Sequence, residues 1–225
     1  MKKIGMLVAV EMDAVLSQYG EPQEKRVDTG FEVLTYRNET YTLYAVNAGA
    51  GEIAAAAATQ LLISAYRVDM VLNFGVVGGL TPEMARARTC VVQAVVHYDF
   101  DVSEVGWAEP GRYMQYPTVY IPTTPALVER ACEIEPGLKP VICASADKFV
   151  DRPERKRELH ERFKADICEM EAAGVVLTCD RSRVPCLLIK TVSDGIEGGA
   201  EEFNRELTRS AALCLEIADK IIREL

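Results

Sequence analysis

One segment decides the fold: Cys168-Glu169-Met170-Glu171-Ala172-Ala173-Gly174. It lies where a short apolar strand, residues 165–168, passes into a helix whose first residues are small enough for close packing. Glu169 and Glu171 flank a methionine, so in an extended chain their side chains point to the same side. Two interpretations are open from these residues alone. One carboxylate faces a buried polar ligand, or both are solvated acids favoured by the helix macrodipole.

Two other segments have a related form, a buried strand that runs directly into glycines or an acid. Residues 70–74 (MVLNF) lead into a glycine-rich turn at 75–79, and residues 185–192 (PCLLIKTV) lead into Ser193-Asp194-Gly195. In open α/β sheets, ligands bind beyond the carboxyl ends of the strands. We therefore expect Asp194 to lie at a binding site.

Expected strands alternate with expected helices along the whole chain, and no linker, repeat or low-complexity tract separates them. A chain of 225 residues fits one large α/β domain. We predict a single three-layer domain over residues 1–225, with a central mixed β-sheet flanked by helices. The expected strands are 3–10, 31–38, 41–48, 70–74, 89–96, 117–121, 140–144, 165–168 and 185–192, and the main helices are 51–66, 124–132, 152–163 and 201–224.

The composition excludes several classes of partner. Hydrophobic residues make up 49% of the chain and charged residues 26%, which is ordinary for a globular protein. A formal charge of −9 argues against nucleic acid or an anionic membrane surface as a partner. No apolar stretch reaches the roughly 18 residues of a spanning helix, and Met1-Lys2-Lys3 leads into a strand rather than a signal-peptide core. We therefore expect a cytoplasmic location.

Metal and cofactor chemistry is not predicted. The seven cysteines stand singly, mostly in apolar segments, and we interpret them as reduced thiols that fill the core. With only His97 and His160 present, neither a histidine-based metal centre nor a Ser-His-Asp triad is expected. The charge run of residues 152–163 is interpreted as a solvated helix face.

Three segments taken together resemble a known superfamily. Residues 73–80, Glu169-Met170-Glu171 and Ser193-Asp194, in this order, are similar to the nucleoside phosphorylases and nucleosidases, and within them to the 5'-methylthioadenosine/S-adenosylhomocysteine nucleosidases. The resemblance extends from Lys3 to the last helix. It implies hydrolysis of the N-ribosidic bond of 5'-methylthioadenosine, S-adenosylhomocysteine or a related adenine nucleoside, with release of adenine, and a role in methionine salvage.

The resemblance also implies roles for single residues. Asp194 is the general acid that delivers a proton to N7 of the purine, and Ser193 holds it. Glu171, as an ionised acceptor, takes hydrogen bonds from the 2' and 3' hydroxyls of the ribose, and Met170 packs under the sugar. Phe149 stacks on the purine. The further site residues that it implies are Val150 at the base edge, Phe203 over the 5'-thio group, Glu169 in support of its turn, and Val76, Val77 and Gly78 of the glycine-rich segment.

The site of the attacking water departs from the family pattern. An ungapped alignment puts Asp13 where these nucleosidases carry the glutamate that positions the water, and Glu11 falls two residues earlier. The family's serine and arginine are replaced by Val76 and Lys190. The choice between Asp13 and Glu11 is therefore open, and Val76 has no side-chain hydrogen bond to offer.

Two other functions are considered. A phosphate-dependent purine nucleoside phosphorylase needs a cluster of anion donors, and the first turn lacks the Gly-Asp-Pro-x-Arg pattern of those enzymes. A non-catalytic nucleoside-binding protein would keep the base and ribose contacts alone. The resemblance implies a homodimer, in which Val102 and Val105 of the 98–107 loop reach the partner's pocket.

Overall fold

The computed structural model describes all residues, 1–225, and its centre is one mixed β-sheet of ten strands. The strand order is β10-β6-β8-β9-β5-β1-β4-β3-β2, with β7 beside β6. Because β10 also pairs with β5, the strands β5, β10, β6, β8 and β9 close into a ring. The strands are β1 (Lys2–Val8), β2 (Glu24–Asp28), β3 (Phe31–Arg37), β4 (Tyr41–Asn47), β5 (Met70–Gly79), β6 (Thr89–His97), β7 (Ile121–Pro122), β8 (Lys139–Ser145), β9 (Ile167–Glu169) and β10 (Cys186–Asp194).

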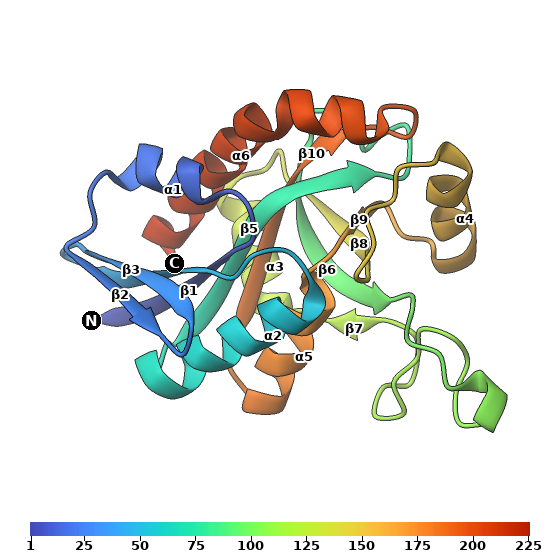
Figure 1. Cartoon of the computed structure of the whole chain (residues 1–225), viewed down its shortest axis with the longest axis horizontal. Helices are drawn as coiled ribbons and strands as arrows, with labels where there is room; N and C mark the ends of the chain where they lie inside the picture. The colour runs from blue at the N-terminus through green and yellow to red at the C-terminus, as the bar shows by residue number, and fades with distance from the viewer.

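Helices cover both faces of this sheet, as Figure 1 shows. They are α1 (Met12–Tyr19), α2 (Glu52–Leu61, continued by a π-helical turn at Leu62–Tyr66), α3 (Pro125–Ile134), α4 (Pro153–Phe163), α5 (Ala172–Ser182) and α6 (Gly199–Glu224). One core cluster lies between the sheet and α2 with α5, and a second lies between the sheet and α1, α3 and α6. The predicted three-layer α/β fold with a mixed central sheet is confirmed.

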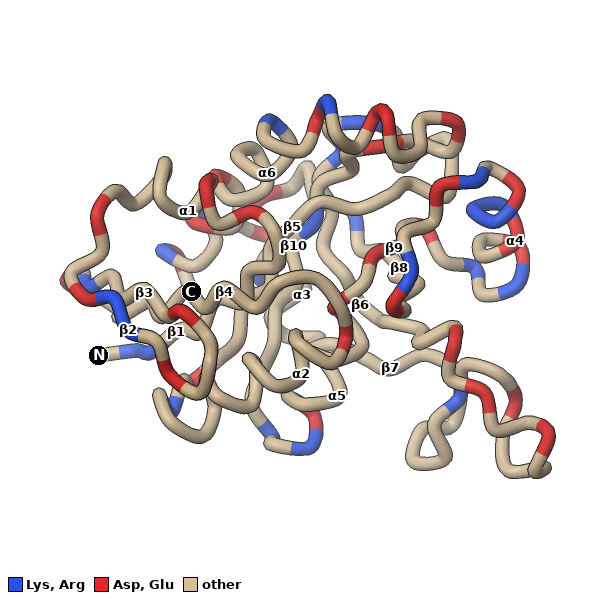
Figure 2. The backbone as a smooth tube through the Cα atoms, viewed as in Figure 1, with Lys and Arg blue, Asp and Glu red and all other residues tan.

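Sequence periodicity located most elements to within two or three residues. In α6, helical spacing predicts an apolar face of Leu207, Ala211, Leu215, Ala218 and Ile222, and all of these but Leu207, which is partly exposed, are buried. Figure 2 shows basic and acidic positions interspersed along α4 and α6, the two most charged helices. None of the helices is long and apolar enough to cross a membrane.

The glycine-rich segment 75–79 is a correction to the expected turn, because β5 continues through it to Gly79. Glycine lets other groups approach the strand here. A Cβ at Gly79 would lie 1.9 Å from the carbonyl oxygen of Met84, and one at Gly78 would lie 3.0 Å from Sγ of Cys168. The glycines therefore let Met84 and Cys168 pack closely against β5 at the place where the sequence predicts a turn.

Two edge strands were misplaced or missed. β2 is a charged, half-exposed strand with the sequence EKRVD, so it carries no apolar alternation that would predict it. The short strand expected at 117–121 is found at Ile121–Pro122, paired with β6. Edge strands are specified by main-chain pairing more than by side-chain burial, which explains both differences.

Candidate active site

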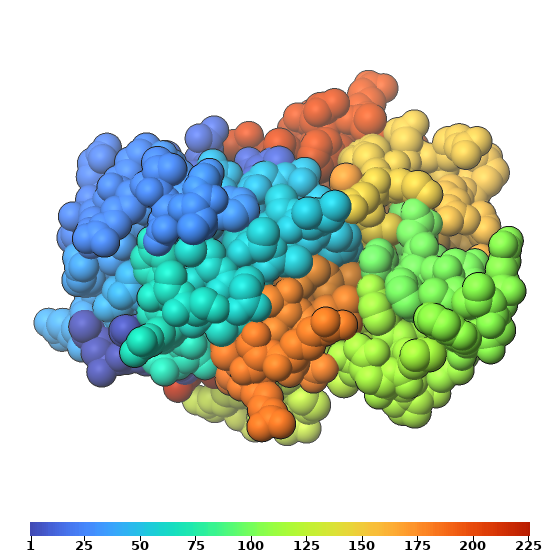
Figure 3. All heavy atoms as spheres, turned by 60° about the horizontal axis from the view of Figure 1, so that its bottom comes forward, coloured from blue at the N-terminus to red at the C-terminus, as the bar shows by residue number.

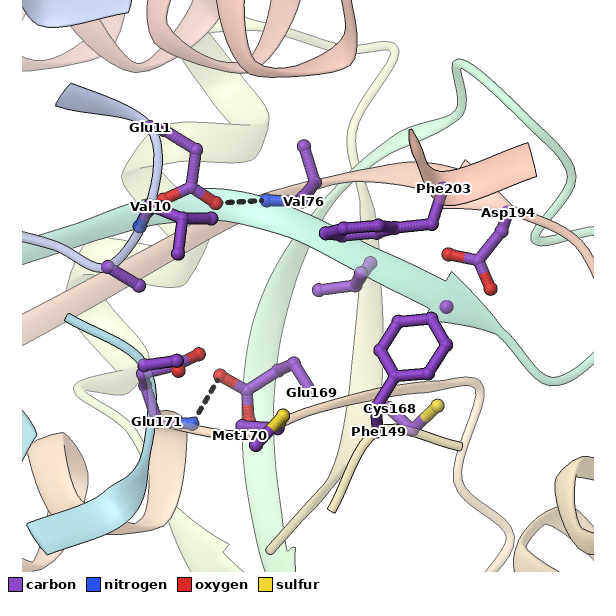
Figure 4. Close-up of a pocket in the computed structure, with 14 residues that line it drawn as sticks. Val10, Glu11, Val76, Phe149, Cys168, Glu169, Met170, Glu171, Asp194 and Phe203 are labelled. Carbon is purple, nitrogen blue, oxygen red and sulfur yellow. Dashed lines mark hydrogen bonds between the residues drawn. The ribbon is translucent and has the colours of Figure 1, made fainter. Parts of the chain in front are cut away.

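A pocket opens where β1, β5, β9 and β10 end, on the side from which α1, α5 and α6 begin (Figure 4). Its walls come from seven separate stretches of the chain. The lining residues are Ala9, Val10, Glu11, Ala50, Val76, Val77, Gly78, Phe149, Cys168, Glu169, Met170, Glu171, Asp194 and Phe203. The segment 168–171 and the strand end at Asp194, which were predicted to be a binding site, thus meet in one cavity.

Glu11 is the carboxylate that the β1–α1 connection brings to this pocket. It is buried, and its two oxygens each accept a backbone hydrogen bond at 3.0 Å, Oε1 from N–H of Val76 and Oε2 from N–H of Val10. Gly75 makes room for it, since a Cβ there would lie 2.8 Å from Oε1.

Asp13 does not line the pocket. β1 ends at Val8 and α1 begins at Met12, so Asp13 lies in the first helical turn with its side chain exposed. The ungapped alignment assigned the water-positioning place to Asp13 because it did not account for this early start of the helix. The structure brings Glu11 to the pocket instead.

Glu169 and Lys190 form a buried ion pair at the pocket floor. Nζ of Lys190 lies 3.2 Å from Oε2 of Glu169, and the side chains are 2% and 3% exposed. Glu169 also accepts hydrogen bonds from N–H of Glu171 and Ala172 and from the Ser145 hydroxyl, so it fixes the start of α5. Burial alone would lower the pKa of Lys190, but the nearby carboxylates, Glu169 foremost, raise it above its ordinary value. Lys190 is therefore a cation, and its charge is directed at Glu169.

Glu171 lies beside them at the N-terminus of α5. Its Oε1 accepts a hydrogen bond from N–H of Gly51 at 2.8 Å. Burial, followed by the negative charge of Glu169, raises the pKa of Glu171 to about 8. The carboxyl of Glu171 is therefore more readily protonated than that of an exposed glutamate.

Asp194 is buried at the opposite end of the pocket. The ladder between β10 and β5 shifts register between Val192 and Asp194, and such a bulge re-aims the side chains that follow it. Oδ1 accepts a hydrogen bond from the Ser193 hydroxyl at 2.8 Å, and Oδ2 accepts one from Nζ of Lys156 at 2.5 Å. Burial raises the pKa of Asp194, and Lys156 opposes that shift.

Lys156 was missed by sequence reasoning, which took the whole of 152–163 as a solvated face. It is fully buried, on the same side of α4 as Leu159 and Phe163. The i, i+3, i+7 spacing of these three residues was the available signal, because it marks Lys156 as part of the inward face.

Aromatic residues cover the mouth of the pocket. The rings of Phe149 and Phe203 meet edge to face with centroids 5.2 Å apart, and Phe149 is 45% exposed. Met170 lines the floor, and Val150 lines a small adjoining cavity that shares Gly78 and Asp194. Val102 and Val105 lie in the 98–107 loop, outside both cavities.

No group of three or more His, Cys, Asp or Glu side chains is arranged to hold a metal ion. All seven cysteines are free thiols, and six of them are buried. Two buried lysines, Lys156 and Lys190, contact the carboxyl groups that line the pocket.

This fold, with carboxyl groups at the strand ends, is that of the phosphorylase superfamily, whose sequence profile matches residues 3–223. The chain therefore belongs to the phosphorylase superfamily. It is 31% identical to the 5'-methylthioadenosine/S-adenosylhomocysteine nucleosidase of Shewanella sediminis over 216 residues, which are 92% of this chain and 93% of that protein. Within the superfamily, its place is in this nucleosidase branch, which confirms the resemblance found in the sequence.

Solved structures agree with this placement. An aspartate-to-asparagine variant of the Helicobacter pylori nucleosidase, with 5'-methylthioadenosine in its active site, superposes with a TM-score of 0.94 at 27% identity, covering 100% of both chains. A futalosine hydrolase of Helicobacter pylori gives the same TM-score at 28% identity, covering 100% of this chain and 98% of that one.

Proposed function

We propose that this protein hydrolyses the N-ribosidic bond of 5'-methylthioadenosine, S-adenosylhomocysteine or a related adenine nucleoside and releases adenine. The main observation behind the proposal is that carboxyl groups lie at the two opposite ends of the pocket. Figure 4 shows the carboxyl of Asp194 at one end and those of Glu11 and Glu171 at the other. A nucleoside cleavage needs this division, because the base must gain a proton while the sugar carbon becomes positively charged.

Asp194 is the proposed general acid. Adenine is a poor leaving group as an anion, so protonation of N7 must accompany cleavage. A carboxyl donates a proton near neutral pH only if its pKa is raised, and burial provides this for Asp194. Ser193 orients the acid, Phe149 stacks on the purine, and the backbone of Val150 binds the base edge.

Glu171 and Met170 form the proposed ribose site. The ribose hydroxyls are donors that meet the carboxyl of Glu171, and their hydrogen bonds favour its ionised form. Met170 packs under the sugar, and Phe203 covers the 5' substituent. An ionised Glu171 would then lie close to the ribosyl carbon as positive charge develops there.

Glu11 is the proposed ligand of the attacking water. Backbone N–H groups hold both of its oxygens in place, and each oxygen keeps a lone pair for a water molecule. The same arrangement opposes a phosphorylase. The N–H groups of Val76 and Val10 are already occupied, and the negative charge of Glu11 repels phosphate.

A homodimer is the proposed assembly. Figure 3 shows α2, α5 and the green loop region around residues 98–118 side by side on one face. Ile53, Val105 and Trp107 are large apolar side chains exposed in α2 and this loop. Light scattering on the purified protein tests the dimer. The cytoplasmic location and the role in methionine salvage stay predictions.

The test is an assay with 5'-methylthioadenosine, without and with phosphate, in which adenine and the sugar product are followed by chromatography. Adenine with free 5-methylthioribose in both buffers supports hydrolysis. A sugar 1-phosphate would identify a phosphorylase, and a thermal shift without turnover would identify a binding protein. Asp194→Asn is expected to abolish cleavage while binding survives, and full activity in that variant would contradict the acid assignment.

The water assignment has a matched pair of variants. Glu11→Gln is expected to reduce kcat by about 100-fold or more, whereas Asp13→Asn, on the exposed side of α1, is expected to change it less than about twofold. The reverse pattern would return the role to Asp13.

A further inference from the structure

Lys156 is a fully buried cation for which the proposed reaction has so far no use. Its side chain is 0% exposed, and Nζ donates to Oδ2 of Asp194 at 2.5 Å and to the carbonyl oxygen of Gly195 at 2.7 Å. Lysine is almost never fully buried unless it is paired. Its partner here is the residue that we propose as the general acid.

Three elements are shaped to bring this lysine to the acid. Lys156 comes from the inward face of α4 and Asp194 from the bulged end of β10, and Gly78 of β5 lies beside the pair. A Cβ at Gly78 would lie 3.3 Å from Oδ2 of Asp194 and 3.5 Å from Nζ of Lys156. A side chain at this position would therefore be in van der Waals contact with both groups of the pair.

Lys156 is the only cation among the groups that act on Asp194. The others are the Ser193 hydroxyl beside Oδ1, the Cys168 thiol from β9, and Glu202 from α6, which is held by N–H of Gly195. None of these can neutralise a carboxylate on Asp194. Lys156 can, at hydrogen-bond distance and away from water, where such an interaction is strongest.

We propose that Lys156 is a positioning residue for the general-acid step: its ammonium group holds Oδ2 of Asp194 and stabilises the carboxylate that is left when the proton moves to the purine. The inference rests on the proposed function of Asp194. In this step the O–H bond of Asp194 breaks and an N–H bond forms at N7. The electron pair of the ribosyl–N9 bond passes to the purine, which leaves uncharged, and Asp194 becomes an anion beside Lys156.

Ser193 fits this sequence of states. Its hydroxyl has one hydrogen and two acceptors, Oδ1 of Asp194 at 2.8 Å and the carbonyl oxygen of Val77 at 3.2 Å. It donates to Val77 while Oδ1 carries the proton, and to Oδ1 once that proton has left. With Oδ2 held by Lys156, the transferable proton stays on the other oxygen.

The consequence for pH dependence has a definite sign. Activity requires protonated Asp194, so it falls as the pH rises through the pKa of that group. Removing the cation disfavours the carboxylate, which moves this alkaline limb to higher pH, while the weaker acid transfers its proton more slowly. A lysine that only supported the fold would leave the limb unmoved.

The experiment measures kcat and KM from pH 5 to 9 for Lys156→Met, Lys156→Gln and Lys156→Arg with 5'-methylthioadenosine. For Met and Gln we expect kcat to fall about tenfold or more, KM to change less than about threefold, and the alkaline limb to rise by about one pH unit. The Lys156→Arg variant keeps the positive charge, so we expect its kcat to fall at the same alkaline pH as that of the wild type. Arg157→Met is the matched control, because it lies on the same helix in an exposed pair with Glu197.

A second substrate separates proton transfer from folding. A 5-methylthioriboside of 4-nitrophenol has a leaving group that needs no protonation, so the Lys156 variants are expected to lose far less activity on it. If folded Met and Gln variants keep the wild-type limb, or lose activity equally on both substrates, the inference is overturned. If Met does not fold, the same criteria apply to Gln. An inactive Asp194→Asn together with unmoved Lys156 profiles would refute only this inference, whereas an active Asp194→Asn would refute the proposed acid itself.

Discussion

Replacing Lys190 with methionine tests the charge balance beneath the pocket. Methionine is close to lysine in length and shape, so the substitution removes the charge and changes the packing little. Glu169 then keeps its hydrogen bonds from N–H of Glu171 and Ala172 but loses its only ion-pair partner, at 3.2 Å. Breaking a buried pair costs roughly 3–5 kcal/mol, and the retained hydrogen bonds place the expected loss of unfolding free energy at about 3 kcal/mol.

The assay is urea unfolding at pH 8, with the free energy extrapolated to water. A second variant, Lys190→Met with Glu169→Gln, removes both charges. The amide oxygen of the new glutamine can accept hydrogen bonds from N–H of Glu171 and Ala172, and its NH₂ group can donate one to Ser145. The double variant is therefore expected to regain most of the lost stability. Lys220→Met is the control, because its pair with Glu135 is exposed to solvent and is expected to contribute little to stability. A loss below about 1 kcal/mol for Lys190→Met, or a double variant no more stable than the single one, would refute the reasoning.

Two further predictions concern stability. Burial, and then the charge of Glu169, raises the pKa of Glu52 from 4.5 to about 7, so the folded state keeps a proton that the unfolded chain has lost. The unfolding free energy should therefore fall as the pH rises from about 4.5 to about 7, and Glu52→Gln should remove part of that fall in denaturation curves measured across this range; an unchanged slope would contradict the burial argument. Gly174→Ala places a Cβ 2.4 Å from the carbonyl oxygen of Glu52, so α2 and α5 must separate at a cost of about 1–3 kcal/mol. Thermal unfolding that shows a stabilised variant, as helix propensity alone would give, would disprove this close contact.

Much of the fold was predictable because its strands are buried on both faces and appear as apolar runs. The helical period of α6 likewise gave its inward face. β2 could not be found this way, since a charged edge strand has no burial pattern to detect. The glycines of β5 predict a turn, because local propensity carries no information about the close packing of Met84 and Cys168 against this strand.

The candidate site was predictable where its residues follow strands directly, as Glu171 and Asp194 do. The choice between Glu11 and Asp13 depended on where α1 begins, and a boundary error of two residues exchanges a pocket residue for an exposed one. Lys156 could be suspected from its spacing with Leu159 and Phe163, but its partner could not. The pair joins residues 38 positions apart, and a long-range contact of this kind leaves no local pattern.

The closure of the central strands into a ring separates the chemistry of this protein from its choice of substrate. β10 pairs with β6 over residues 189–191 and with β5 as far as Asp194, which lies opposite Gly78. The ring therefore fixes the strand that carries Asp194. Phe149 lies in the loop after β8, and Phe203 lies in the first turns of α6 beyond the end of β10, so both can move while the ring stays intact. Under the proposed function, changes around Phe203 can therefore admit a different 5' group while Asp194 keeps its place at the end of β10.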